Sequence, residues 1–289
     1  WSSDVCSSDL DASTLLDEVT ANIAAIGGGN FGTVTDVARG SYRLRVTGRD
    51  DRTDLRLDVA NVVLGDKEVL NIVLQPSTGG VLVHALVLPQ RGAPTAYKNG
   101  FARARLVAAA SGNAAVSAQV GSTSINVNLR SPSVGGYTLV PAGAQSVLVT
   151  VNGSSTLGGS MSLTAGGDYS LLAHGTSTAP VFTLLTDDNR LPSTSGKARM
   201  RLVHAAAGVD GGLTLSKDFV AVANAVGYGS ASTPLLVDSS TGARLEVTSP
   251  LSADPLYALS DVVVTSGGVY TMFVLGGAAS PAGVLRRDR

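Results

Sequence analysis

Three histidines are the residues of this sequence best suited to acid–base or metal chemistry, and they stand at His84, His174 and His204. An imidazole can bind a metal ion or transfer a proton near neutral pH. A zinc site, however, needs several nitrogen, sulfur or carboxylate ligands that converge, and no two of these histidines share a local segment. We interpret them as isolated residues at strand ends. His174 and His204 approach each other only if two repeats of the chain meet there.

Two pairs of adjacent aspartates form the second candidate, Asp50–Asp51 in GRDDRTD and Asp187–Asp188 in TDDN. Carboxylates act as general acids and bases inside clefts, and they bind calcium when oxygen ligands alternate along a loop. Neither pair has that alternating spacing, and charged neighbours favour solvated turns. We therefore predict turns, with cation binding at the TDDN junction as the alternative.

Glycine-rich and serine-containing segments give no stronger indication of a nucleotide site or a catalytic serine. GGGNFG at Gly27–Gly32 fits G-x-G-x-x-G, but strand-like residues follow it where a nucleotide site needs a helix. Gly196–Lys197 lacks the remainder of a phosphate loop, and the serines lack a G-x-S-x-G elbow. Asn152-Gly153-Ser154 is a formal glycosylation sequon, but Asn-Gly first predicts a hairpin turn. We predict no catalytic, cofactor-binding or metal-binding residues, no cofactor and no enzyme activity.

The first ten residues, WSSDVCSSDL, match the translation of a sequencing adapter in full, so we expect residues 1–10 to be a disordered artefact. The alternative is a genuine serine-rich N-terminus, which would also be a disordered tail. They contain the only cysteine, Cys6, and the only tryptophan, Trp1. Without Asp4 and Asp9 the chain has 21 basic and 20 acidic residues, a net charge of +1 in place of −1. A near-neutral chain gives no electrostatic reason to expect nucleic acid as a partner.

The remaining composition favours short strands and tight turns. Only 15% of the residues are charged and 34 are glycine, a mixture that suits strands better than helices. No apolar run is long enough to span a membrane. The length suits two or three domains.

Internal repeats set the expected architecture. ARARLVAAASG at Ala102–Gly112 returns as ARMRLVHAAAG at Ala198–Gly208, with eight of eleven positions identical. LTAGGDYSLLAHG at Leu163–Gly175 returns as VTSGGVYTMFVLG at Val264–Gly276. A more diverged copy around VARGSYRLRV precedes both and lacks the opening strand, as expected of a truncated N-terminus with an exposed strand edge. The predicted repeats cover residues 11–93, 98–191 and 196–289.

Seven short alternating segments occur in the second repeat: RARLV, VSAQV, SINVNL, YTLV, SVLVTV, YSLLA and VFTLL. They predict tandem immunoglobulin-like β-sandwiches of about seven strands each in an all-β chain. Tyr169 and Tyr270 follow Gly-Gly turns and resemble tyrosine corners, in which the hydroxyl binds nearby backbone. The segment DASTLLDEVTANIAAIG also fits an amphipathic helix, although its repeat counterpart favours a strand.

The ARxRLVHAAAG opening, the V-x-x-G-x-x-x-L-x-V middle strand and the L-x-x-G-x-x-Y-T close resemble the bacterial domain-of-unknown-function family numbered 4397. The resemblance covers residues 11–289 and is strongest in the last two copies. Asp210 is kept, but the proline usual before it is missing. The resemblance implies an exported protein of the periplasm or cell surface, often lipid-anchored through its missing N-terminus. It assigns no functional residues.

These observations predict a non-catalytic structural or interaction module of the bacterial cell envelope, with an envelope protein or polysaccharide as its unknown partner. The alternative is an array that binds carbohydrate or another surface ligand. Sugar binding commonly uses exposed aromatic rings, for which the candidates are Tyr42, Tyr97, Tyr137 and Tyr228.

Overall fold

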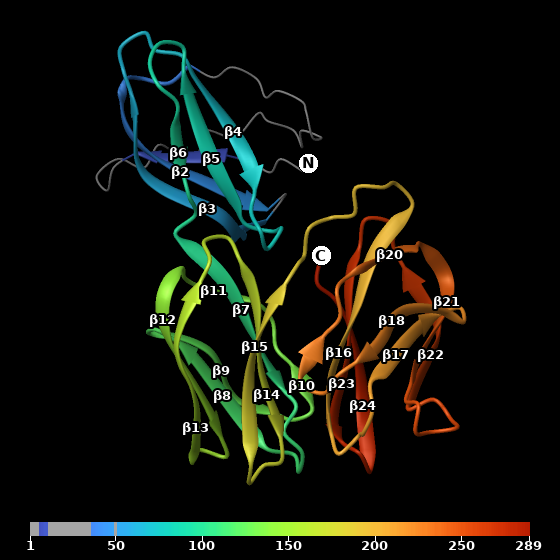
Figure 1. The fold of residues 1–289 in the computed structure, drawn as a ribbon. Coiled ribbons are helices and arrows are strands. Elements are labelled where there is room, and N and C mark those ends of the chain that lie inside the picture. Colours follow the sequence, from blue (N-terminus) through green and yellow to red (C-terminus); the bar gives the residue numbers. More distant parts are fainter. Residues whose placement is uncertain (1–5, 11–35, 49–50) are drawn as a thin grey trace. The chain divides into compact units, whose positions relative to one another are not determined.

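The computed structural model describes residues 6–10, 36–48 and 51–289, and every regular element in these ranges is a β-strand (Figure 1). The chain divides into two compact units. The N-terminal unit ends at Ala102 and also takes in Thr164–Gly167. The second unit, the sandwich pair, comprises residues 103–163 and 168–289. The predicted all-β class with tandem β-sandwiches is confirmed.

The N-terminal unit contains two three-stranded sheets around a small apolar core. The first sheet has the order β1-β2-β3 and the second the order β4-β5-β6. The core lies between them because alternate residues of the paired strands are apolar, among them Leu44, Val46, Leu57 and Val87. The strands are β1 (Cys6–Leu10), β2 (Gly40–Gly48), β3 (Asp51–Leu64), β4 (Leu70–Pro76), β5 (Val83–Pro89) and β6 (Thr95–Tyr97).

Cys6–Leu10 form a strand, whereas the sequence predicted disorder for residues 1–10. β1 pairs antiparallel with β2 over its whole length, from Cys6 opposite Val46 to Leu10 opposite Tyr42. Backbone groups make this pairing, so an unpaired sheet edge accepts an extended segment with little regard to its side chains. The helix or strand predicted for residues 11–27 and the Gly27–Gly32 turn lie outside the described residues.

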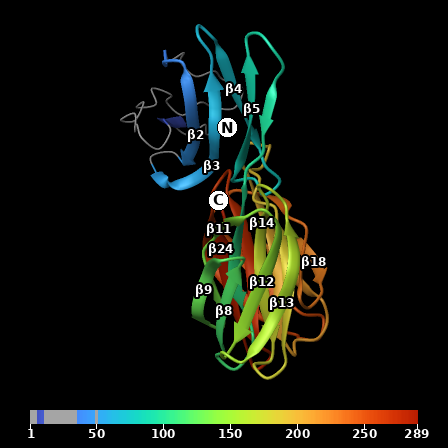
Figure 2. The same cartoon turned by 90° about the vertical axis from the view of Figure 1, so that its left-hand side faces the viewer.

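The middle sandwich packs a five-stranded sheet on a four-stranded one (Figure 2). The five-stranded sheet has the order β10-β7-β14-β15, with β11 also paired to β7, and the four-stranded sheet has the order β13-β12-β8-β9. β7 and β14 run parallel. The strands are β7 (Phe101–Ala108), β8 (Ala115–Val120), β9 (Thr123–Arg130), β10 (Ser133–Val134), β11 (Thr138–Pro141), β12 (Gly143–Val151), β13 (Ser155–Leu163), β14 (Asp168–Gly175) and β15 (Pro180–Asp187).

The C-terminal sandwich has the same strand order, β19-β16-β23-β24 with β20 paired to β16, and β18-β17-β21-β22. β16 and β23 again run parallel. The strands are β16 (Lys197–Ala207), β17 (Leu213–Lys217), β18 (Val220–Val226), β19 (Ser230–Ala231), β20 (Leu235–Asp238), β21 (Ser240–Thr248), β22 (Tyr257–Val264), β23 (Val269–Gly277) and β24 (Ser280–Arg287). Both sets of strands fall within the predicted ranges 98–191 and 196–289.

Each sandwich therefore has nine strands where seven were predicted. In the middle sandwich the prediction missed β10 and β13. β10 is only two residues long. β13 carries Gly158 and Gly159 on a sheet edge, so its sequence lacks the apolar alternation by which a half-buried strand is recognised.

Two of the central strands are buried on both faces. All residues of β14 but the last, and all of β23 but the last, are buried. A strand that packs in the sandwich core on one face and on a second layer on the other is expected to be a continuous apolar run. β23 is close to this pattern, whereas β14 also carries the buried polar residues Asp168, Ser170 and His174. The inner core of the C-terminal sandwich includes Met200, Leu213, Leu215 and Leu245. The predicted tyrosine corner is present there, since the Thr265 N–H donates to the Tyr270 hydroxyl at 2.9 Å.

Gly158 fixes the β12–β13 hairpin, and we expect Gly158→Ala to destabilise it by about 1–3 kcal/mol. Its φ is +117°, and an added Cβ would lie 2.2 Å from the Val147 carbonyl oxygen. Chemical unfolding measures the loss. Gly136→Ala is the matched control in the same sandwich, because a Cβ there meets no atom within 4 Å and the backbone has no positive φ. Equal effects of the two substitutions would contradict this account of β13.

Candidate functional site

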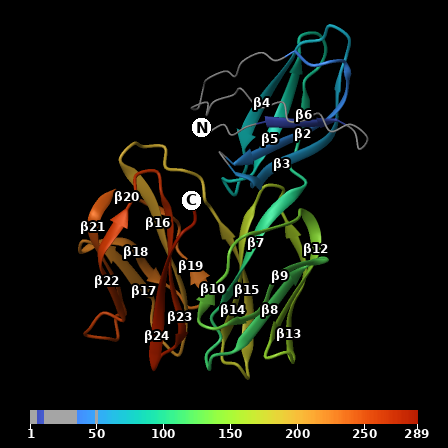
Figure 3. The same ribbon diagram turned by 180° about the vertical axis from the view of Figure 1, so that it is seen from behind.

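The two sandwiches meet through one face of each. This face is formed by β7, β14 and β15 of the middle sandwich and by β16, β23 and β24 of the C-terminal sandwich (Figure 3). At one end of the face, a buried apolar cluster joins the layers. Its members are Val107, Ala109, Val134, Leu172, Leu185, Val203, Ala205, Phe273 and Leu275. We call these residues the apolar cluster.

The other end of the face carries two buried ion pairs that are reciprocal. Arg105 Nη1 of the middle sandwich lies 2.5 Å from Asp288 Oδ1 of the C-terminal sandwich. Arg201 Nη2 of the C-terminal sandwich lies 2.5 Å from Asp187 Oδ1 of the middle sandwich. Arg105 and Arg201 occupy the same position of the ARxRLV strand. Each sandwich thus gives one arginine and one aspartate to the other, as two subunits do across a two-fold axis.

Two hydroxyl groups close these pairs into a ring. Arg105 Nε donates to Ser170 Oγ at 2.9 Å, and Ser170 Oγ donates to Asp187 Oδ2 at 2.6 Å. In the other sandwich, Arg201 Nε donates to Thr271 Oγ1 at 3.0 Å, and Thr271 Oγ1 donates to Asp288 Oδ2 at 2.6 Å. The members of this Arg–Asp ring are Arg105, Ser170, Asp187, Arg201, Thr271 and Asp288.

A second group of polar side chains extends the ring within the middle sandwich. The Tyr137 hydroxyl donates to Asp187 Oδ2 at 2.7 Å, and the Arg105 guanidinium lies 4.4 Å from the Tyr137 ring centroid. Asn189 Nδ2 donates to Asp168 Oδ2 at 2.7 Å and to the Tyr137 hydroxyl at 3.1 Å. Arg103 Nη2 lies 2.5 Å from Asp168 Oδ2. The hydrogen bonds to the Asp187 and Asp168 carboxylates are charge-assisted, which makes them shorter and stronger than neutral hydrogen bonds.

Burial and charge act in opposite directions on the acids of this region. Burial would raise the pKa of Asp187, but Arg201 and Arg105 outweigh it, so the pKa lies below its usual value. At Asp168, burial wins over Arg103 and Asn189, and the pKa is raised. Burial also raises the pKa of Tyr137 well above its usual value. Asp187 is therefore ionised at neutral pH and acts as an anchor for the two arginines.

The prediction that Asp187–Asp188 lie in a solvated turn is wrong for Asp187, whose side chain is 0% exposed. The alternative was that this junction binds a cation. In the structure the positive charge beside Asp187 is the guanidinium of Arg201. Asp188 binds Arg190 and Arg199 at 2.7 Å each. Among the residues that the structure describes, no three His, Cys, Asp or Glu side chains are grouped to hold a metal ion.

The face brings together two of the three histidines. The His174 ring lies 4.9 Å from the Tyr228 ring and the His204 ring lies 5.5 Å from it, both edge-on. His174 is 4% exposed and His204 is 0% exposed. His174 Nε2 lies 2.9 Å from Thr183 Oγ1. His174 Nδ1 has no hydrogen-bond partner. The His204 ring nitrogens make no well-aligned hydrogen bond, although the Val209 backbone lies close enough to raise the His204 pKa.

Burial lowers the pKa of both imidazoles. At His174 the neighbouring His204 lowers the pKa further. At His204 the Val209 backbone opposes the effect of burial without cancelling it. Both histidines are therefore neutral at physiological pH. Sequence reasoning could not pair them, because Tyr228, which lies against both rings, comes from the turn between β18 and β19.

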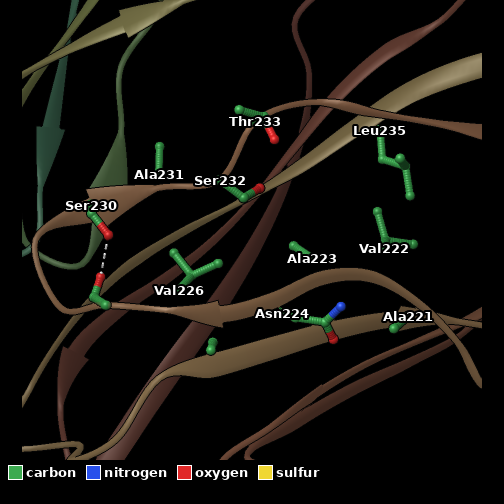
Figure 4. Close-up of a pocket in the computed structure, with 12 residues that line it drawn as sticks. Ala221, Val222, Ala223, Asn224, Val226, Ser230, Ala231, Ser232, Thr233 and Leu235 are labelled. Atoms are coloured by element: carbon green, nitrogen blue, oxygen red, sulfur yellow. Dashed lines mark hydrogen bonds between the residues drawn. The ribbon is translucent and has the colours of Figure 1, made fainter.

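A groove of about 480 Å³ opens along the edge of the C-terminal sandwich, between β18 and the β19–β20 segment (Figure 4). Its apolar wall includes Val222, Ala223 and Leu235, and its polar groups include Asn224 and Thr233. Small side chains leave this space open.

The middle sandwich fills the corresponding space. Asn126 pairs with Ala118 as Ala223 pairs with Leu215, so Asn126 and Ala223 hold equivalent places on β9 and β18. The Asn126 Oδ1 atom lies only 2.4 Å from where a Cβ of Gly135 would stand. An asparagine carboxamide therefore occupies in one sandwich the position that alanine leaves free in the other.

The remaining predicted residues have structural surroundings. His84 Nδ1 accepts a hydrogen bond from the Asn99 N–H at 3.0 Å. Asp51 Oδ1 accepts from the Thr53 N–H at 2.9 Å at the exposed start of β3, and Asp50 lies outside the described residues. Asn152 and Gly153 both have positive φ in the β12–β13 turn. Gly196 also has positive φ, and Lys197 Nζ lies 2.7 Å from Asp238 Oδ1.

The four tyrosines proposed for sugar binding do not form a platform. Tyr42 is buried, and its hydroxyl donates to the Ala38 carbonyl. Tyr97 is partly buried in β6, and Tyr137 belongs to the polar group beside the Arg–Asp ring. Tyr228 is 43% exposed, so it alone of the four offers a ring to a ligand.

Residues 102–211 match the model of a family described as domain of unknown function (DUF4397). The matched segment runs from β7 through the middle sandwich to the turn after β16, and includes the first opening motif and its second copy. The resemblance inferred from the motifs is confirmed for these residues. No curated protein matches the chain. Among the described residues, no helix is long and apolar enough to cross a membrane.

Proposed function

We propose that this chain is a non-catalytic structural or interaction module of the bacterial cell envelope, built from tandem repeats of one domain and exported to the periplasm or cell surface. The family resemblance and the near-neutral, glycine-rich composition support this proposal. The proposed partner is a protein or polysaccharide of the envelope.

The observation that carries the proposal is the Arg–Asp ring. Its arginines and aspartates bind one another across the two sandwiches and are buried, with Arg105 3% and Asp288 1% exposed. A catalytic acid, base or nucleophile has to reach its substrate, whereas these groups are used to join two domains. Their arrangement holds two sandwiches in one fixed orientation, which suits a spacer or a presenting scaffold.

A co-sedimentation experiment tests the proposal. The purified full chain is incubated with peptidoglycan sacculi, with lipopolysaccharide and with detergent-extracted envelope proteins, and bound protein is measured against bovine serum albumin. We expect saturable retention by one of these fractions. No retention by any fraction, together with hydrolase turnover that a single substitution abolishes, would overturn the proposal in favour of an enzyme.

The groove beside β18 favours a second candidate, the binding of a carbohydrate or another small surface ligand. Its wall combines apolar side chains with the amide of Asn224 and the hydroxyls of Ser230, Ser232 and Thr233. Binding sites commonly pair an apolar wall with a few polar groups that orient the ligand. Tyr228 stands close by in the chain, in the turn between β18 and β19.

Ala223→Asn should close this groove, because asparagine fills the equivalent space in the middle sandwich. If the groove binds glycans, we expect at least a tenfold loss of affinity on a panel of envelope oligosaccharides, measured by isothermal titration calorimetry. Circular dichroism has to show that the variant is folded under the same conditions, because Ala223 is 6% exposed and packs in the core of its sandwich. Asn126→Ala in the middle sandwich is the matched control and should leave binding intact. A glycan that binds the wild type and Ala223→Asn equally would exclude the groove as its site.

A further inference from the structure

The histidine cluster on the shared face, which consists of His174, His204 and Tyr228, contains buried polar atoms that lack good partners. Three of the four ring nitrogens of His174 and His204 make no well-aligned hydrogen bond, and only the Val209 backbone beside His204 favours a proton there. Buried polar groups in folded proteins are nearly always paired, so unpaired ones require an explanation. A neutral imidazole has one nitrogen that accepts and one that donates, whereas an imidazolium donates from both. Protonation here would bury charge with almost no acceptors.

The cluster also spans both sandwiches. His174 lies on β14 of the middle sandwich, where Thr183 of β15 is its one hydrogen-bond partner. His204 lies on β16 of the C-terminal sandwich, and Tyr228 precedes β19 in that same sandwich. An added Cβ on Gly229 would stand 2.9 Å from His174 Cε1, so the turn packs directly on the imidazole. Any repulsion within the cluster therefore pushes one sandwich away from the other.

The charged groups around the cluster do not offset the positive charge that protonation of the two imidazoles adds. The elements packed on His174 and His204 present each other's imidazole and the Tyr228 phenol as titratable groups, and no carboxylate of the described residues contributes to either pKa. Arg286 donates to the Val134 carbonyl across the same face without contributing to either pKa. Asp187 is six residues along β15 from Val181, the residue paired with His174. That spacing is about 20 Å of strand.

We propose that His174, His204 and Tyr228 form an acid-sensitive latch, and that protonation of the two imidazoles in mildly acidic surroundings separates the sandwiches at this end of their shared face. Opening would give the imidazoles water as a hydrogen-bond partner and would expose the apolar cluster next to them. In the Arg–Asp ring at the other end of the face, Asp187 keeps its charge in this pH range, because Arg201 and Arg105 lower its pKa.

The sign of the effect follows from where the protons bind. In water the pKa of each histidine returns to its ordinary value of 6.5, whereas in the closed state burial lowers it. Below pH 6.5 the open state therefore binds more protons than the closed state, and acid favours opening. Each titrating histidine changes the ratio of open to closed protein by up to about tenfold per pH unit, so two give up to about a hundredfold.

A distance measurement between the sandwiches tests the latch in the full chain. Nitroxide labels are placed at the exposed alanines by Ala179→Cys and Ala253→Cys, in a Cys6→Ser background, and electron–electron resonance gives the distance distribution. We expect one narrow distance at pH 7.5 and a growing longer distance toward pH 5. Circular dichroism should show unchanged β-structure over the same range. Loss of the sheet signal together with the short distance would show general unfolding and overturn the proposal.

Matched variants identify the groups whose protonation opens the latch. His174→Phe with His204→Phe keeps two aromatic rings but removes both titratable groups, and this protein should hold the short distance at pH 5. His84→Gln, in the N-terminal unit, should open like the wild type. Opening of the double variant at the wild-type pH would overturn the latch.

A second measurement decides the matter if the double variant does not fold. In the wild type, proton resonances of the His174 and His204 rings should titrate together with the appearance of the longer distance. Titration near pH 6.5 without any change of distance would equally contradict the proposal.

Discussion

Replacing Arg105 by methionine is expected to lower the free energy of unfolding of the sandwich pair by about 3–5 kcal/mol. Methionine keeps much of the side-chain volume but leaves Asp288 buried without its cation, since the two atoms are 2.5 Å apart and both side chains are almost fully buried. The Ser170 hydroxyl loses its donor as well. Urea unfolding monitored by circular dichroism measures the loss.

We attribute this loss of stability to the charge of Asp288 that remains buried without a partner, and a double variant tests this cause. Arg105→Met combined with Asp288→Leu removes both charges, and we expect it to recover most of the lost stability, because apolar replacements of buried ion pairs are often neutral. Lys197→Met breaks a surface pair whose aspartate side chain is 77% exposed and should change little. If the single and double variants were equally unstable, the loss would come from packing and not from the unpaired Asp288.

Phe273→Ala is expected to destabilise the sandwich pair by about 3–5 kcal/mol, the usual cost of truncating a buried phenylalanine. Phe273 is 0% exposed, belongs to the apolar cluster, and lies 5.0 Å from the Arg105 guanidinium. Its removal leaves a cavity between the two sandwiches. We therefore expect the sandwiches to unfold in two separate steps in this variant, which calorimetry resolves.

Leu215→Ala provides the comparison for Phe273→Ala. Leu215 is fully buried in the inner core of the C-terminal sandwich and takes no part in the shared face. Its truncation should cost about 2–5 kcal/mol and unfold the C-terminal sandwich first, while the Arg–Asp ring still forms in the folded state. A Phe273→Ala protein that unfolds in one step, at the wild-type temperature, would show that the apolar cluster does not hold the two sandwiches together.

The β-sandwich fold follows from local signals in the sequence. Strands such as VSAQV in β8 alternate apolar and polar residues because one face is buried, and that period of two appears within a few residues. β13 was not predicted, because its edge position and its two adjacent glycines remove the alternation of apolar and polar residues. β1 was not predicted either, because Cys6–Leu10 are held to β2 by backbone pairing, which is independent of the side-chain pattern.

The shared face could not be predicted in the same way, because its partners are far apart in the chain. Arg105 and Asp288 are separated by 183 positions, and nothing local distinguishes their bond from a solvated charge. One signal was nevertheless present. The motif ARxRLV places an arginine next to the apolar run of a strand in both copies. A buried arginine needs an anion, and both copies end on an aspartate, Asp187 and Asp288.

The histidines were left apart for a related reason. Their spacing excluded a local metal motif, and the sequence allowed a meeting only at a junction of repeats. The structure gathers His174 and His204 through Tyr228, an aromatic residue whose place in the chain carries no pattern. A contact made by a turn on a neighbouring domain depends on how two finished domains pack, and this packing depends on shape more than on periodicity.

The Arg–Asp ring and the apolar cluster hold the two sandwiches as one rigid body. Residual dipolar couplings of backbone amides at pH 7.5 measure this rigidity, with alignment tensors determined separately for residues 103–187 and 197–288. We expect a single tensor, equal in magnitude and orientation for both sandwiches. Two tensors of different magnitude would mean that the sandwiches move independently, and would contradict both the spacer function and the latch that depends on it.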